Sequence, residues 1–287
     1  DVAFVGGINI IDDRLDLTHG ITETPRLDFA VALRGPLVQA VRTTARAMWT
    51  RARLGHQWRD EVLALASSRK PMVEARRLLR RLRGKEAEPL ADEPPAPMQA
   101  AFVVRDNVSQ RRSIERAYVE AIRSASRCVD IAVPYFYPGR AFRRSLRGAA
   151  RRGVQVRLLL QGKIDYRIAA LAAHVLYDEL CTRGIRIYEY TPAFLHAKVA
   201  VIDDDWATVG SSNIDPLSLL LNLEANVVVR DPGFALALRA RFESAYAVST
   251  EVGGVPTRQG WRGWLQRGVV AWVAATYLRV AGITGRY

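Results

Sequence analysis

Two side chains that could do chemistry stand close together in this sequence, because a single residue separates His196 from Lys198 and Asp203 follows soon after. The residues around them are apolar and predict a β-strand, in which alternate side chains leave the same face of the sheet. An imidazole and an ammonium group on one face form a site for phosphate. The chain contains only four histidines and four lysines, so chance rarely produces this spacing. Asp203 begins a run of three aspartates, where a turn or anchoring role competes with direct chemistry.

A turn after this strand adds polar groups that suit the same site. It contains Ser211 and Asn213 next to Gly210, and small residues there permit the backbone to approach a ligand closely. The Asn213 amide can donate a hydrogen bond to a phosphate oxygen. Glu224, in the strand that follows, is predicted to hold one nitrogen of His196 and to leave the other facing substrate. The constellation therefore resembles a triad with a histidine at its centre.

The second half of the chain must position these residues, and its hydrophobic pattern alternates between strands and helices. A helix is predicted over residues 109–125, where apolar side chains recur on one face. Strands are predicted at 100–104, 129–133, 154–160, 185–190, 197–202 and 224–230. Short apolar strands that alternate with helices predict an α/β sandwich, with mixed central sheets flanked by helices.

The chain also contains an internal duplication. Residues 2–10 resemble residues 206–214 at an offset of 204. Further along, residues 27–36 resemble residues 223–232 at an offset of 196. Two matching segments in the same order predict two related halves of one α/β fold.

The duplication assigns equivalent positions in the two halves. Asn9 corresponds to Asn213 and is predicted to bind phosphate, while Asp28 corresponds to Glu224 and is predicted to support a histidine of the first half. The offset of 204 places the counterparts of the histidine and the lysine before residue 1. The given chain is therefore expected to be truncated at its N-terminus.

Composition shifts along the chain suggest where the halves meet. A stretch rich in proline, glutamate and alanine has the character of a solvated linker. The final residues space tryptophan, leucine and valine along one helical side, with arginines flanking them, which fits either an interfacial anchor or a helix packed on the domain. The predicted segments are a truncated first half (1–83), a linker (84–98), a second half (99–250) and an amphipathic tail (251–287).

The overall charge favours phosphate-rich partners. The net charge is +13, carried mainly by arginine, and this suits either nucleic acid or an anionic lipid surface. A proteome rich in arginine would produce the same charge without any such partner. Two cysteines without paired spacing predict neither a metal site nor a disulfide framework. No apolar run reaches the roughly 20 residues that span a bilayer.

The motif resembles the signature of the phospholipase D superfamily. The residues that carry the resemblance are His196, Lys198, Asp203, Gly210, Ser211 and Asn213. It implies that two such motifs meet in a single site, where one histidine forms a phosphohistidine and the other protonates the leaving alcohol. No metal and no cofactor are implied. His196 would be the acid, and the 287-residue chain alone is expected not to turn over.

Three segments resemble the B-type branch of bacterial cardiolipin synthases, namely 135–139, 161–162 and 195–225. This resemblance implies transfer of a phosphatidyl group from one phosphatidylglycerol to another, at the cytoplasmic side of the bacterial inner membrane, to which the protein would bind peripherally. Tyr135 and Phe136 would then lie near the substrate cleft, although both also fit a core role. Nucleic acid is not expected as a partner, and the oligomeric state stays open. A nuclease of the same superfamily and a non-catalytic binder of anionic lipid are the alternatives.

Overall fold

The computed structural model describes residues 1–16, 20–67, 73, 98–105, 110, 112–162, 176–215 and 223–253. The predicted linker (84–98) lies outside this part of the chain except for residue 98, and the predicted tail (251–287) lies outside it except for residues 251–253. Two compact units are present. The first contains Asp1–Phe4 together with Ala32–Pro97, and the second contains Val5–Val31 together with Met98–Tyr287. The segment before residue 32 is thus divided, and most of it belongs with the second half.

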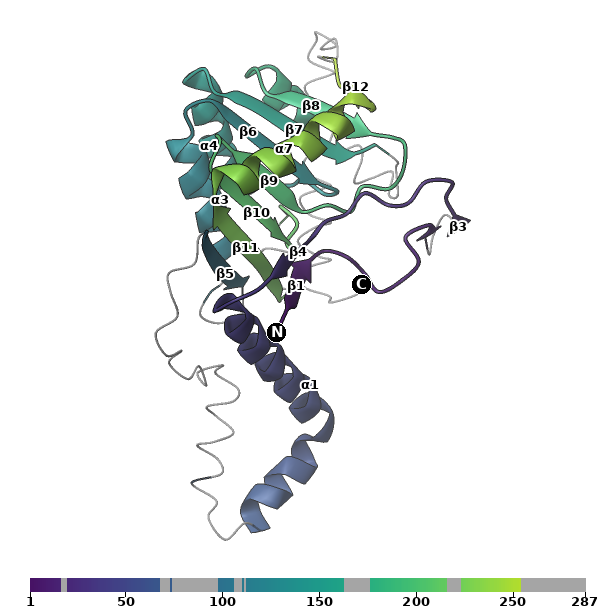
Figure 1. Cartoon of the computed structure of the whole chain (residues 1–287), viewed down its shortest axis with the longest axis vertical. Helices are drawn as coiled ribbons and strands as arrows, with labels where there is room; N and C mark the ends of the chain where they lie inside the picture. The colour runs from purple at the N-terminus through teal and green to yellow at the C-terminus, as the bar shows by residue number, and fades with distance from the viewer. Residues whose placement is uncertain are drawn as a thin grey trace, which may run out of the picture. The chain divides into compact units, whose positions relative to one another are not determined.

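The second unit is built on a mixed sheet of eight strands in the order β12-β8-β7-β6-β9-β10-β11-β5 (Figure 1). The strands are β5 (Gln99–Arg105), β6 (Cys128–Val133), β7 (Gln155–Gln161), β8 (Arg186–Tyr190), β9 (Val199–Ile202), β10 (Trp206–Gly210), β11 (Glu224–Arg230) and β12 (Ser249–Glu251). β6, β7 and β8 pair in parallel, and the remaining neighbours pair antiparallel. The predicted α/β class, with a mixed sheet flanked by helices, is confirmed.

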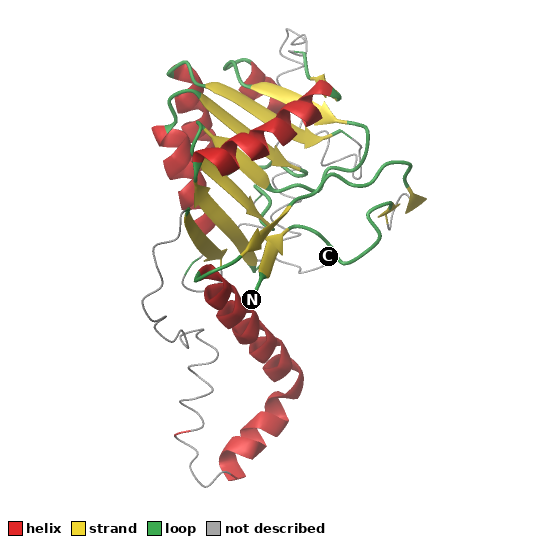
Figure 2. Cartoon of the chain, viewed as in Figure 1, coloured by secondary structure: helices red, strands yellow, loops and turns green. Residues whose placement is uncertain are grey.

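Helices cover both faces of this sheet (Figure 2). The helices α3 (Ser113–Ser124) and α4 (Arg140–Arg151) pack over one hydrophobic cluster, whereas α7 (Pro232–Ala247) packs over a second. α3 buries a stripe with helical spacing that includes Ile114, Tyr118 and Ile122. α7 begins where the Asp231 side chain accepts a hydrogen bond from Phe234 N at 2.7 Å.

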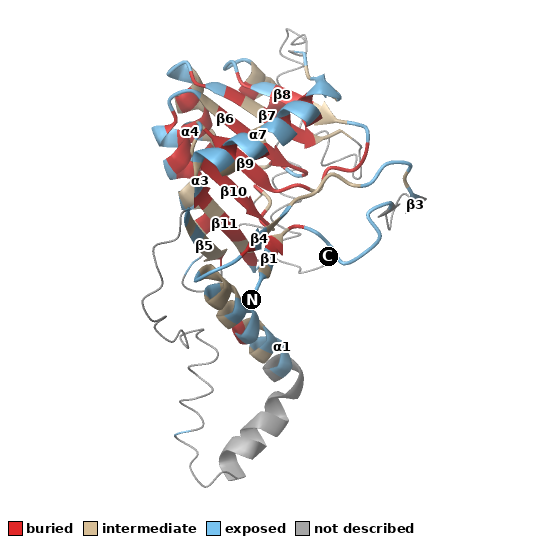
Figure 3. Cartoon of the chain, in the orientation of Figure 1, coloured by how far each residue is buried: buried red, intermediate tan, exposed pale blue. Residues whose placement is uncertain are grey.

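Because both faces are covered, the central strands are apolar on both sides and almost wholly buried (Figure 3). β6 and β9 show this most clearly, since neither has an exposed residue. The active residues must therefore project from the ends of the strands, where the covering helices stop. No helix in the described part of the chain has both the length and the apolar character that crossing a bilayer requires.

The first unit contains the long helix α1 (Leu37–Ser67). Two further pairs of short strands complete the secondary structure near the N-terminus: β1 (Ala3–Gly6) with β4 (Ala30–Leu33), and β2 (Leu15–Asp16) with β3 (Gly20–Ile21).

Matching contacts support the duplication. Gly7 N donates to Phe29 O at 3.3 Å, and Ser211 N donates to Ala225 O at 3.0 Å. The two donors are 204 residues apart and the two acceptors 196 residues apart, which are the offsets found in the sequence. The first copy therefore repeats a local strand pairing of the second copy.

Candidate active site

The central group of the site is His196, which is oriented by a carboxylate from the other repeat. His196 Nδ1 lies 2.7 Å from Asp28 Oδ2, with 27% of the histidine side chain exposed and 6% of the aspartate. The backbones also pair, since His196 N donates to Leu27 O and Leu27 N donates to Phe194 O, both at 2.8 Å. A carboxylate at Nδ1 favours the tautomer with its proton there, so the other ring nitrogen, Nε2, is left for substrate.

This contact corrects the predicted role of Glu224. The sequence assigned the carboxylate of Glu224 to His196, but the structure places Asp28 there. Glu224 instead accepts a hydrogen bond from the Ser211 hydroxyl. Because Asp28 and Glu224 occupy equivalent positions of the repeat, the carboxylate of one half serves the histidine of the other.

Lys198 lies beside the histidine and is 3% exposed. Its Nζ donates to His196 O at 2.5 Å. Burial lowers the pKa of Lys198 to about 8, against the opposing influence of the Asp28 and Glu224 carboxylates, and the positive charge of Arg26 lowers it further. Water solvates a buried ammonium poorly. An incoming phosphate would therefore stabilise its positive charge more than it would stabilise that of an exposed lysine.

The lowered pKa of Lys198 predicts a pH dependence of stability. In an unfolded chain a lysine titrates near pH ~10.4, so between about pH 8 and pH 10.4 the unfolded state binds more protons and stability rises with pH. Lys198→Met removes this contribution. The stability advantage of the variant over the wild type should therefore shrink between about pH 7 and pH 9.5, as measured by urea unfolding. A difference that stays constant with pH would contradict the buried, charged state of Lys198.

The predicted phosphate-binding residues differ in burial and in hydrogen bonding. The Asn213 side chain is half-buried, and its Oδ1 is buried without a hydrogen-bond partner within the described residues. The Ser211 hydroxyl gives its one proton to Glu224 and accepts from Ala225 N at 3.1 Å. Ser211 therefore orders the turn and cannot at the same time donate to phosphate. Asn9, the counterpart of Asn213, is exposed.

Asp203 has an anchoring geometry. It lies at the opposite end of β9 from the histidine, with a φ of 48°. Its carboxylate accepts from the backbone N–H groups of Ser126, Arg127 and Cys128 at 2.8 to 3.0 Å. Burial alone would raise the pKa of the Asp203 carboxyl, but these hydrogen bonds hold it below its usual value. The predicted catalytic assignment is thus replaced by the anchoring role that the sequence left open.

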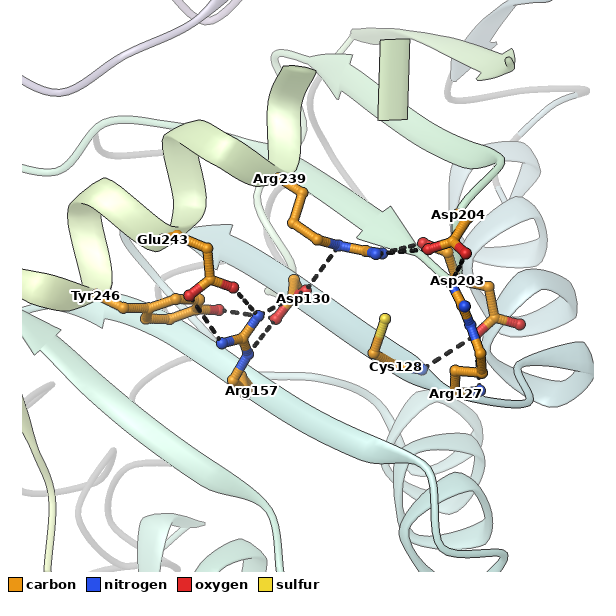
Figure 4. Close-up of polar contacts among 9 residues, drawn as sticks. All are labelled: Arg127, Cys128, Asp130, Arg157, Asp203, Asp204, Arg239, Glu243 and Tyr246. Carbon is orange, nitrogen blue, oxygen red and sulfur yellow. Dashed lines mark hydrogen bonds and ion pairs between the residues drawn. The ribbon is translucent and has the colours of Figure 1, made fainter. Parts of the chain in front are cut away.

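Asp203 also adjoins a buried charge network beneath α7 (Figure 4). Asp130, fully buried on β6, accepts from Arg157 Nε at 2.7 Å and from the Tyr246 hydroxyl at 3.2 Å. Arg157 also donates to Glu243 at 2.6 Å. Arg239, 3.8 Å from Asp130, donates to the Asp203 carbonyl and to the Asp204 carboxylate. The network joins α7 to the strands that hold the site residues.

The two aromatic residues proposed for the cleft separate in the structure. Phe136 is 4% exposed and packs against Phe142 with ring centroids 6.2 Å apart, so it belongs to the core. Tyr135 is 41% exposed. The following residue, Tyr137, donates from its backbone N to Ile214 O at 2.6 Å, which brings this segment next to the Asn213 turn. Tyr135 therefore remains a candidate for substrate contact, whereas Phe136 is a core residue.

Sequence reasoning missed three residues that shape the site. Gly7 lies against Lys198, because an added Cβ would lie 3.0 Å from Lys198 Cδ and 3.2 Å from its Nζ. Arg26 places a positive charge near the same ammonium. Gln161 Oε1 accepts from Leu195 N at 2.9 Å and so fixes the segment that enters the motif. Gly7 had a usable signal as the counterpart of Ser211 in the repeat, and Gln161 lies in the segment 161–162 that carries the family resemblance.

No cluster of three or more histidine, cysteine, aspartate or glutamate side chains in the described ranges is arranged to hold a metal ion. The positive groups near His196 are instead Lys198 and Arg26. Together with the second ring nitrogen of His196, these groups are chemically suited to bind a phosphate next to an acid or nucleophile.

Comparisons with known proteins agree with this chemistry. Residues 118–246 match the family described as "Cardiolipin synthase, PLD-like domain". The chain is 37% identical over 250 residues to cardiolipin synthase B of Shigella flexneri and to that of Escherichia coli strain K12, which covers 87% of this chain and 54% of each relative. Among solved structures, the phosphatidylserine synthase of Haemophilus influenzae Rd KW20 superimposes with a TM-score of 0.55 at 11% identity, over 90% of this chain and 62% of that one. The chain thus spans about half the length of the curated relatives it matches.

Proposed function

Because the chain belongs to the phospholipase D superfamily and is similar to cardiolipin synthase B over most of its length, we propose that it forms part of a phosphatidyl transferase. The enzyme would join two phosphatidylglycerol molecules into cardiolipin and release glycerol. The observation that carries the proposal is that the Asp28 carboxylate orients the His196 ring, while the buried Lys198 ammonium donates to the His196 backbone carbonyl beside it. A phosphate diester is the substrate that this charge pattern suits.

The proposed reaction proceeds in two steps at phosphorus. A histidine from a second His-x-Lys half-site attacks the phosphorus of the first lipid, and His196 Nε2 donates a proton to the departing glycerol. His196 then accepts a proton from the hydroxyl of the second phosphatidylglycerol as that oxygen attacks the phosphohistidine. Lys198 stabilises the negative charge that develops on the phosphoryl oxygens in both steps.

The printed chain contains one His-x-Lys pair, so this mechanism needs a second half-site that the 287 residues do not supply. We propose that the chain alone binds phosphate but does not turn over. The enzyme would act as a peripheral protein at the cytoplasmic face of the bacterial inner membrane, where anionic lipid suits the charge of +13.

The experiment that tests the proposal compares two proteins on phosphatidylglycerol vesicles. One is the chain as printed, and the other is the same chain extended upstream by residues that carry a second His-x-Lys pair. Mass spectrometry should find cardiolipin and released glycerol only with the extended protein. Sustained synthesis by the printed chain would contradict the need for two half-sites. Cleavage of a nucleic acid without any lipid product would replace the transferase with a nuclease.

A further inference from the structure

Asn226 lies in one row with the site lysine, across the sheet. Gly210 pairs with Asn226 on β11, and on its other side Gly210 N donates to Lys198 O at 3.1 Å. Residues directly opposite each other in antiparallel strands project from the same face. The side chains of Lys198 and Asn226 therefore project from one face of the sheet. Gly210, which has no side chain, lies between them.

The hydrogen bonds of Thr208 determine how the Asn226 amide is turned. The Thr208 hydroxyl donates its proton to Val227 O at 2.9 Å, so towards Asn226 it can only accept. The group that faces it, at 3.2 Å, is accordingly the Asn226 Nδ2 amine. The Oδ1 oxygen must then be directed away from Thr208.

The Asn226 oxygen lies over Gly210. A Cβ added to Gly210 would lie 2.2 Å from both Cγ and Oδ1 of Asn226, so the amide fills the space that a side chain would take. Asn226 is 1% exposed, and its Oδ1 has no hydrogen-bond partner within the residues described. A buried acceptor without a donor costs roughly 1–3 kcal/mol, and native proteins rarely leave one unused.

We propose that Asn226 is a positioning residue for Lys198, whose ammonium is linked to Asn226 Oδ1 across Gly210 through one buried water molecule. The inference rests on the proposed phosphate-binding role of Lys198. An ammonium carries three donors, and the bond to His196 O uses one of them. A second bond, through this water to a neutral amide, would hold the ammonium in place without neutralising the charge that the phosphate is to meet.

The repeat indicates that this device belongs to one half only. The counterpart of Asn226 in the first copy is Ala30, and the counterpart of Gly210 is Gly6. An added Cβ on Gly6 would meet the Ala30 Cβ at 2.8 Å, so the close approach is kept but the amide is not. The two half-sites therefore would hold their lysines by different means.

The pKa of Lys198 provides a readout that a purely structural role would not move. The charged groups that face its ammonium are Asp28, Glu224 and Arg26. The other lysines are Lys70, Lys85 and Lys163, and replacing these by arginine leaves a single lysine signal in an NMR titration of 15N-labelled side chains. None of the three is among the site residues named above.

Three variants are compared in this background. Asn226→Asp should raise the pKa of Lys198 by at least ~1 unit, because an opposite charge arrives within reach of the ammonium. Asn226→Leu, which has the same shape without the acceptor, should lower it. Val227→Ala, a buried change on the neighbouring position of the same strand, should leave it unchanged while costing comparable stability.

The outcomes separate this inference from the proposed function. If the pKa of Lys198 is the same in Asn226→Asp, Asn226→Leu and the parent, with all three folded, Asn226 does not position the lysine. Binding of inorganic phosphate, followed by 31P NMR, should weaken at least ~3-fold in Asn226→Leu. A parent protein that does not bind phosphate at all would overturn the proposed function, whereas the pKa result would still decide the contact.

Discussion

Replacing His196 by alanine, in a protein that contains both half-sites, is expected to lower the rate of cardiolipin formation about 10²- to 10⁴-fold. The imidazole is the group that would protonate the leaving glycerol, whereas the neighbouring Lys198 is proposed to stabilise charge on the phosphoryl oxygens. Initial rates on phosphatidylglycerol vesicles, measured by mass spectrometry, provide the test. The loss should appear in turnover, because the proposed phosphate-binding residues Lys198 and Asn213 are unchanged.

A matched control and a companion variant sharpen this result. His56→Ala changes a histidine that is not part of the His-x-Lys motif, and should retain full activity. Asp28→Asn keeps the shape at His196 Nδ1 but removes the negative charge, so its rate should fall between those of the parent and His196→Ala. If Glu224→Gln slowed the acid step and Asp28→Asn did not, the observed pairing of Asp28 with His196 would not be the functional one.

Replacing Asp130 by alanine is expected to lower the free energy of unfolding by about 3–5 kcal/mol. Asp130 is fully buried, and its removal leaves the Arg157 guanidinium without the carboxylate that accepts two of its hydrogen bonds (Figure 4). The Tyr246 hydroxyl loses its acceptor as well. Urea unfolding of the parent and the variant measures the difference.

An exposed pair of similar geometry serves as the control for Asp130. Arg186 forms two hydrogen bonds with Glu251, both at 2.7 Å, but the two side chains are 47% and 44% exposed. Because solvent screens such a pair, Glu251→Ala should cost only about 0–1 kcal/mol. Equal losses for Asp130→Ala and Glu251→Ala would show that burial does not set the strength of the network.

The sheet was predictable because its strands are short, apolar and separated by helices. The predicted strand at 129–133 corresponds to β6, and that at 224–230 has the bounds of β11. The charge network was not predictable, since Asp130 sits inside an apolar run and its partner Arg157 comes from another strand. Only the parallel pairing of β6 with β7, which places Asp130 opposite Arg157, brings the two together.

The motif itself could be found from spacing, but its internal contacts could not. The repeat supplied two equivalent carboxylates, Asp28 and Glu224, and proximity in sequence favoured the wrong one for His196. The choice depends on the pairing of Leu27 with Leu195, a contact that no local pattern encodes. The role of Asp203 was ambiguous for a similar reason. The backbone N–H groups that donate to its carboxylate belong to a segment more than seventy residues earlier.

The contact between His196 and Asp28 spans 168 positions of the chain. A ribosome that adds about 5–20 residues per second needs roughly 8–34 s to proceed from one to the other. Until then the aspartate has been made but the imidazole that it orients has not. The nascent polypeptide thus cannot orient His196 while its sheet is incomplete, and the contact forms only when the later strands have joined the early segment.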